Sequence, residues 1–237
     1  MSEEIIILSV TAASIGFLHT VFGPDHYLPF IVMSKARNWS QRKTLWITTL
    51  CGIGHILGSV VLGLIGVAAG IAISNVETIE SFRGEVAAWM FIAFGLVYFS
   101  WGLKRAIRNK PHTHLHIHEN GAPHSHSHKH NEDHLHPHDN TEKKNITPWV
   151  LFTIFVFGPC EPLIPLLMYP AAQENAFGVF IVATVFGLVT ISTMLTLVML
   201  ASYGISFVSL GKLERYTHAL AGAAIFMSGL AIQFLGL

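Results

Sequence analysis

Residues 19–29 combine groups that bind cations with residues that break helices. His19, Asp25 and His26 lie here inside an apolar stretch of about residues 5–33, and a Gly-Pro pair between them interrupts the helix. Ionisable groups at membrane depth cost about 2.5–3.5 kcal/mol each even on lenient scales, so they indicate a site. Imidazole and carboxylate ligands suit Ni²⁺, Co²⁺ and Zn²⁺. The segment therefore predicts an intramembrane metal site, with a structural His–Asp hydrogen bond as the alternative.

Residues 156–165 repeat this pattern. They resemble residues 21–29, with Gly-Pro followed by a polar pair and a later proline. In this second copy the polar pair is Cys160 and Glu161. An ionised glutamate at this depth needs a cation or a proton, whereas a cysteine is either a soft ligand or a small apolar filler.

A third group of candidates lies in the next apolar segment. Cys51 and His55 are four residues apart, which places them on one face of a helix at a chelating separation. Core packing is the alternative for both residues. The complete predicted intramembrane metal set is His19, Asp25, His26, Cys51, His55, Cys160 and Glu161.

The central loop, residues 104–147, is dominated by alternating histidines. Such spacing places neighbouring imidazoles on one side of an extended chain, where pairs can chelate a metal. Its Pro, Gly, Asn and charge content predicts disorder in the metal-free state. A pH-sensitive polycation and an inert tether are the alternatives. The predicted loop ligands are His112, His114, His116, His118, His124, His126, His128, His130, His134, His136 and His138.

Composition predicts a membrane protein. Of the 237 residues 51% are hydrophobic and 12% charged, with a mean hydropathy of +0.52. The zero net charge argues against a general nucleic-acid-binding face, no ATP-binding loop is present, and no enzymatic activity is expected. Six apolar segments near the membrane-spanning length are predicted at 5–33, 44–73, 86–103, 148–169, 176–202 and 217–237.

The basic residues predict an orientation. Alternate loops hold 13 of the 14 Lys and Arg residues, which places both termini outside the plasma (inner) membrane and the histidine-rich loop in the cytoplasm. The repeated motif then lies in two halves of opposite orientation. We therefore expect an all-α membrane protein of six transmembrane helices, built as two inverted three-helix repeats with interrupted first helices, at 1–103 and 148–237.

These motifs resemble those of the NicO and UreH-like nickel/cobalt transporters, within the LysE-type superfamily. The resemblance rests on His19-x₃-Gly-Pro-Asp25-His26, on residues 158–162 and on the histidine-rich loop. It implies transport of Ni²⁺ or Co²⁺, with His19, Asp25, His26 and His55 as ligands. The His/Asp spacing departs from that of the eight-helix uptake permeases, so import and export both stay open, as does self-association.

The leading hypothesis is thus a secondary transporter of nickel, cobalt or zinc ions, with the metal as substrate and no cofactor. The alternative is a thiol–disulfide electron carrier similar to CcdA, using Cys51 and Cys160. Against it, Asp25 stands where the first repeat would need a cysteine, and the loop histidines have no role. A third reading is a membrane metal sensor or chaperone without transport.

Overall fold

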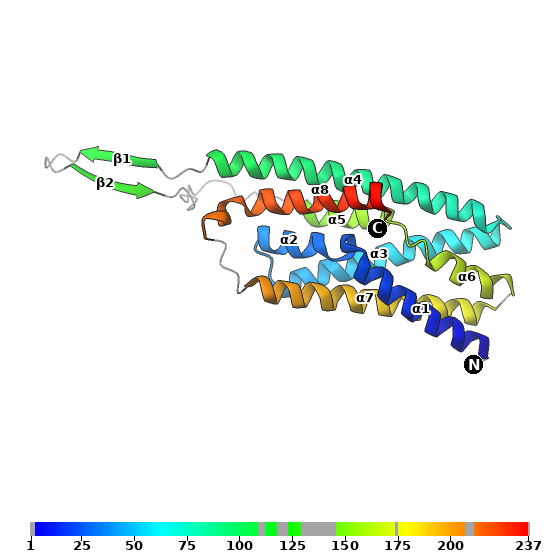
Figure 1. Ribbon diagram of the computed structural model, residues 1–237. Coiled ribbons are helices and arrows are strands. Elements are labelled where there is room, and N and C mark those ends of the chain that lie inside the picture. The colour runs from blue at the N-terminus through cyan, green and yellow to red at the C-terminus, as the bar shows by residue number, and fades with distance from the viewer. Residues whose placement is uncertain are drawn as a thin grey trace, which may run out of the picture.

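The computed structural model describes residues 3–108, 112–117, 123–128, 146–173, 175–206 and 211–236. Within these ranges the chain forms eight α-helices, two 3₁₀ helices and two short strands (Figure 1). The elements are α1 (Glu3–Phe22), η1 (Pro24–His26), α2 (Leu28–Ala36), α3 (Gln41–Ala68), α4 (Ile73–Arg108), β1 (His112–Ile117), β2 (Pro123–His128), α5 (Thr147–Phe157), α6 (Leu163–Ala172), α7 (Ala176–Ser206), η2 (Gly211–Tyr216) and α8 (Thr217–Leu235).

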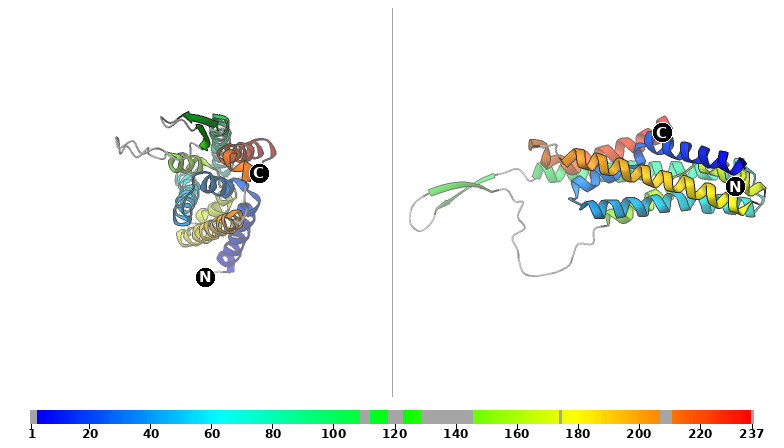
Figure 2. Two further views of the ribbon diagram at one scale, coloured as in Figure 1. Left: turned by 90° about the vertical axis from the view of Figure 1, so that its left-hand side faces the viewer. Right: turned by 90° about the horizontal axis from the view of Figure 1, so that it is seen from below.

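The helices form an elongated bundle, as expected for a protein that crosses a bilayer (Figure 2). Among the described residues, five helices are long and apolar enough to span a membrane: α1, α3, α4, α7 and the helix that includes α8. An all-helical membrane protein is therefore confirmed. The predicted span 148–169 is not one rod, because it is divided into the short helices α5 and α6.

Proline and glycine explain the two divided segments. Pro24 follows Gly23 at the end of α1, and Pro159 follows Gly158 at the end of α5. A proline lacks the N–H that would continue the helical ladder, and its ring clashes with the preceding turn. Both interruptions predicted from the Gly-Pro pairs are present at these positions.

The separation of the predicted segments 44–73 and 86–103 by a loop is wrong, because α4 already begins at Ile73 and continues to Arg108. The charged residues in this stretch suggested a loop, but Glu80 is fully buried in the helix and forms an ion pair with Arg83 one turn later. Pairing lowers the cost of charges in an apolar segment, whereas a hydropathy profile counts each charge as unpaired.

The interior contains two apolar clusters. One includes Phe30, Leu151 and Met194, and the other includes Leu163 and Phe186. Large apolar side chains also cover the outside of the bundle, among them Phe180, Leu188, Leu200 and Phe234. Such a surface matches a lipid environment and would be a liability in water.

The backbones of α4 and α8 approach each other closely at several glycines. A Cβ atom added at Gly102 would lie 2.5 Å from the Ala219 nitrogen, and one at Gly229 would lie 2.8 Å from the Ile92 nitrogen. Gly222 similarly meets the backbone of Phe99. Small residues permit this approach in membranes, where packing rather than water exclusion drives helix association.

Strands β1 and β2 lie beyond the end of the helix bundle (Figure 1) and pair antiparallel. The register sets His112 opposite His128, His114 opposite His126 and His116 opposite His124. The other predicted loop ligands lie outside the described residues: His118, His130, His134, His136 and His138.

Candidate intramembrane site

The first interruption of the bundle positions His26. The Gly23 N–H donates to the His19 carbonyl at 2.9 Å and ends α1, and the His26 N–H donates to the Gly23 carbonyl at 3.1 Å in η1. A Cβ atom added at Gly23 would lie 2.6 Å from His26 Nδ1. Glycine at this position therefore lets the imidazole fold back against the end of α1.

Three imidazoles meet at this interruption, one each from α1, η1 and α3. The ring centroids of His19 and His26 are 4.7 Å apart, and those of His26 and His55 are 5.1 Å apart. One nitrogen from each ring lies within 4.8 Å of the other two. His26 and His55 are buried, and His19 is partly buried. We call His19, His26 and His55 the histidine triad.

The Nε2 atoms of the histidine triad are all buried, and none has a hydrogen-bond partner in the described part of the chain. For His26 the other ring nitrogen is engaged, since Nδ1 lies 3.1 Å from both the Gly23 carbonyl oxygen and Asp25 Oδ1. Both neighbours are acceptors, which places the proton on Nδ1 and leaves a lone pair on Nε2.

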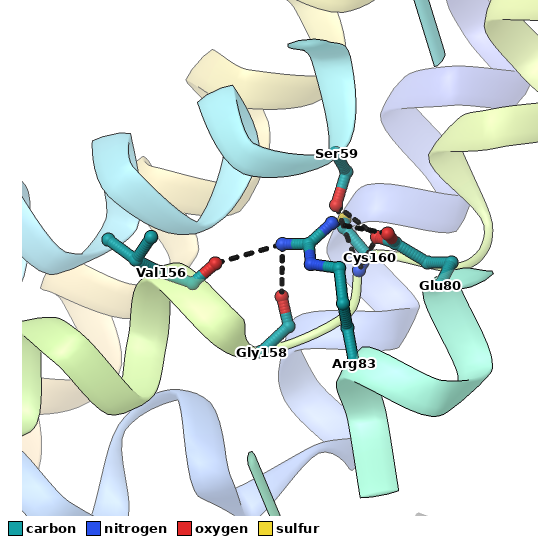
Figure 3. A network of polar contacts seen from close by, with 6 residues as sticks. All are labelled: Ser59, Glu80, Arg83, Val156, Gly158 and Cys160. Carbon is teal, nitrogen blue, oxygen red and sulfur yellow. Dashed lines mark hydrogen bonds and ion pairs between the residues drawn. The ribbon is translucent and has the colours of Figure 1, made fainter. Parts of the chain in front are cut away.

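The second interruption is held by a polar network from α3 and α4 (Figure 3). The Cys160 N–H donates to Glu80 Oε1 at 2.9 Å and lies 3.2 Å from Ser59 Oγ. Ser59 and Arg83 also donate to the Glu80 carboxylate. The buried carboxylate is therefore fully engaged by donors from three different segments.

Arg83 satisfies the end of α5. Its guanidinium donates to the Val156 carbonyl at 2.8 Å and lies 3.4 Å from the Gly158 carbonyl oxygen. The last carbonyls of a helix have no partner within the helix, and exposed backbone groups are costly in a bilayer. Gly84 allows α4 to pack closely against the break after α5, because a Cβ atom at this position would lie 2.8 Å from the Pro159 ring.

The two thiols are both free and fully buried. Cys51 packs in the apolar cluster with Phe30, and Cys160 packs in the cluster with Leu163. Cys51 lies eight residues before Ser59 on α3, roughly 12 Å along the axis at 1.5 Å per residue. Because Ser59 contacts the Cys160 backbone, the thiols lie at different levels of the bundle.

The structure brings together only part of the predicted metal set. The histidine triad forms the one group of three or more candidate ligands among the described residues. Asp25 touches this group through His26, Glu161 is exposed, and Cys51 and Cys160 lie in apolar clusters.

Sequence reasoning missed the second-interruption network. No sequence motif singles out Ser59, and Glu80 and Arg83 fall between the predicted segments 44–73 and 86–103. The spacing of the last two, opposite charges three residues apart at the edge of an apolar segment, was the available signal.

Comparison with known families corrects the functional assignment. The family model described as cytochrome C biogenesis protein transmembrane region matches residues 28–231. No curated protein and no solved structure matches the chain. The predicted membership of the NicO/UreH-like group is therefore wrong, and with it the predicted function as a nickel/cobalt transporter and the assignment of Ni²⁺, Co²⁺ or Zn²⁺ as transported substrate. Short Gly-Pro motifs and a histidine-rich loop do not by themselves identify a transporter family.

Proposed function

Since this chain belongs to the cytochrome c biogenesis transmembrane-region family, we propose that it is a membrane-embedded thiol–disulfide electron carrier. The observation that carries the proposal is the family match, which covers most of the chain. The chain contains two cysteines: Cys51 lies in α3 and Cys160 in the interruption between α5 and α6, and both are buried in the bundle interior.

The proposed reaction is a two-electron exchange. A disulfide between Cys51 and Cys160 accepts two electrons and two protons from a dithiol protein on one side of the membrane, which becomes oxidised. The two thiols are later reoxidised by a disulfide protein on the other side, which becomes reduced. Each exchange passes through a mixed disulfide formed by thiolate attack.

This reaction needs a conformational change. Cysteines whose Cα atoms are more than about 7 Å apart form no disulfide without backbone movement, and Cys51 lies about two helical turns from the level of Cys160. The hinge that we propose is the segment 158–162 between α5 and α6. Side chains of α3 and α4 bind its Gly158 carbonyl and its Cys160 N–H, and in the proposal these contacts break when the segment moves.

Two halves related as an inverted repeat would allow equivalent movements toward the two sides of the membrane. We include in the proposal that α1–α4 and α5–α8 are two such copies. In support, α4 packs on α8 and α3 on α7, while α1 contacts α7 and α5 contacts α3. Each of these contacts has its counterpart under exchange of the two halves. The proposal keeps both termini outside and the central loop in the cytoplasm, as the basic residues indicate.

The test follows the redox state of the thiols in membranes. Membranes are treated with a dithiol reductant or a disulfide oxidant, free thiols are alkylated with a maleimide reagent of high mass, and the bands are counted. We expect two labelled thiols after reduction and none after oxidation. Cys51→Ser and Cys160→Ser should each leave a single thiol that cannot form the intrachain disulfide and should abolish electron transfer. A double Cys→Ser variant with full transfer would refute the proposal.

A further inference from the structure

We propose that the histidine triad binds one divalent transition-metal ion through the three Nε2 atoms. This site is distinct from the two thiols and from the family's description. It is a resident site, and no movement of the ion across the membrane is part of the proposal.

The convergence of three unpartnered nitrogens supports a ligand. A buried polar atom without a hydrogen bond is costly, and each imidazole of the histidine triad has such an atom, Nε2, within the described part of the chain. Each ring also offers one nitrogen that lies within 4.8 Å of a nitrogen of the other two. With the Nδ1 proton of His26 directed at Asp25 and Gly23, the Nε2 lone pair is directed away from them. A shared cation would satisfy all three nitrogens at once, whereas ring packing satisfies none.

The ligand chemistry selects the class of ion. Three neutral imidazoles suit Zn²⁺, Cu²⁺, Ni²⁺ and Co²⁺, whereas Mg²⁺ and Ca²⁺ prefer oxygen ligands. At Zn–N distances of about 2.0–2.1 Å in a tetrahedron, neighbouring nitrogens lie about 3.3 Å apart. The nitrogen–nitrogen distances in the histidine triad have to shorten to reach that spacing. Rotation of the His26 side chain, next to the helix break at Gly23, is the simplest way to shorten them.

The surroundings are those of a metal-bound imidazole. A carboxylate or a backbone carbonyl that accepts from the second ring nitrogen fixes the ring and raises the basicity of the ligand. Asp25 and the Gly23 carbonyl do this for His26. Asp25 also supplies one negative charge to a site whose three ligands are neutral.

The experiment must separate this site from the loop histidines. We would use the full-length chain in detergent with the eleven histidines between residues 112 and 138 replaced by Gln. Zn²⁺ is titrated by calorimetry, and Co²⁺ binding is followed by its visible absorption. We expect one ion per chain, a Co²⁺ spectrum of nitrogen coordination, and a Zn²⁺-dependent rise in the midpoint of thermal unfolding.

Single variants locate the ion. His19→Gln, His26→Gln and His55→Gln should each weaken Zn²⁺ binding by more than about 100-fold, since even outer partners of a ligand contribute 10–100-fold. Unfolding in the absence of Zn²⁺ shows whether each variant folds, and the Co²⁺ spectrum of the parent chain tests the ligand set without any variant. Binding of no metal, or stoichiometric binding that survives all three substitutions, would overturn the proposal.

A cysteine-free control separates this inference from the proposed function. The Cys51→Ser/Cys160→Ser double variant should bind Zn²⁺ as the parent chain does, because neither thiol is a ligand. If binding is lost in that variant while the His→Gln variants keep it, the ion lies at the thiols and the histidine triad is not a metal site. Loss of electron transfer alone leaves the inference standing.

Discussion

Removing the Arg83 guanidinium should strongly destabilise the bundle, because it leaves the Glu80 carboxylate buried without its counter-charge. Glu80 has no exposed surface, and breaking a buried ion pair by removing one partner costs about 3–5 kcal/mol. Arg83→Met also leaves the Val156 and Gly158 carbonyls without their donor. We therefore expect the free energy of unfolding to fall by at least about 3 kcal/mol.

A second substitution, in a double-mutant cycle, tests whether the unpaired Glu80 charge causes the loss of stability. Glu80→Gln removes the charge but keeps an oxygen that can accept from the Cys160 N–H, so the Glu80→Gln/Arg83→Met variant should be more stable than Arg83→Met alone. Arg108→Met, at the exposed end of the same helix, is the matched control and should change little. The assay is reversible unfolding in mixed detergent micelles, followed by circular dichroism. A loss below about 1 kcal/mol in Arg83→Met, the range of an exposed ion pair, would refute the reasoning.

Four further outcomes are expected. Asp25→Asn should weaken Zn²⁺ binding about 10–100-fold in calorimetry, as loss of an outer partner does, and unchanged binding would contradict this role. Zn²⁺ retention should decrease as the pH falls, because protons compete for imidazole nitrogens; equal retention at pH 5 and pH 8 would exclude imidazole ligands. Gly222→Leu should prevent close packing of α4 and α8 and lower the yield of folded protein in size-exclusion chromatography, whereas Gly204→Leu, with no atom within 4 Å of the added Cβ, should not. Saturating Zn²⁺ should slow oxidative disulfide formation between Cys51 and Cys160 in the maleimide assay, and an equal rate would show that the two sites are independent.

The sequence predicts those features that depend on local chemistry. Gly-Pro pairs break helices wherever they occur in an apolar segment, and both interruptions are found. The cost of polar groups at membrane depth predicts a site at His19, His26 and His55, and these three residues meet in space.

Features that depend on packing between distant segments were not predictable in the same way. Nothing in the local sequence tells that Glu161 faces outward while Glu80, from a stretch assigned to a loop, reaches the Cys160 backbone. The distance between Cys51 and Cys160 also depends on how α3 is positioned along the bundle axis relative to the break between α5 and α6, which the local sequence does not determine. A short motif also carries less information than a match along most of the chain, which is why the family match over residues 28–231 overturned the assignment.

Helix α3 relates the two proposed chemistries. Cys51, His55 and Ser59 follow one another at four-residue intervals, so they lie along one face of the helix, about 6 Å apart per interval. Cys160 lies at the level of Ser59, and His55 therefore stands between the two thiols. In the proposed reaction segment 158–162 moves along this face past His55. Gly158 already lies so close to His55 that a Cβ atom added there would be 3.1 Å from the imidazole. An ion that fixes His55 to the ends of α1 and η1 would oppose that movement, and the metal site would then set how readily the carrier is oxidised.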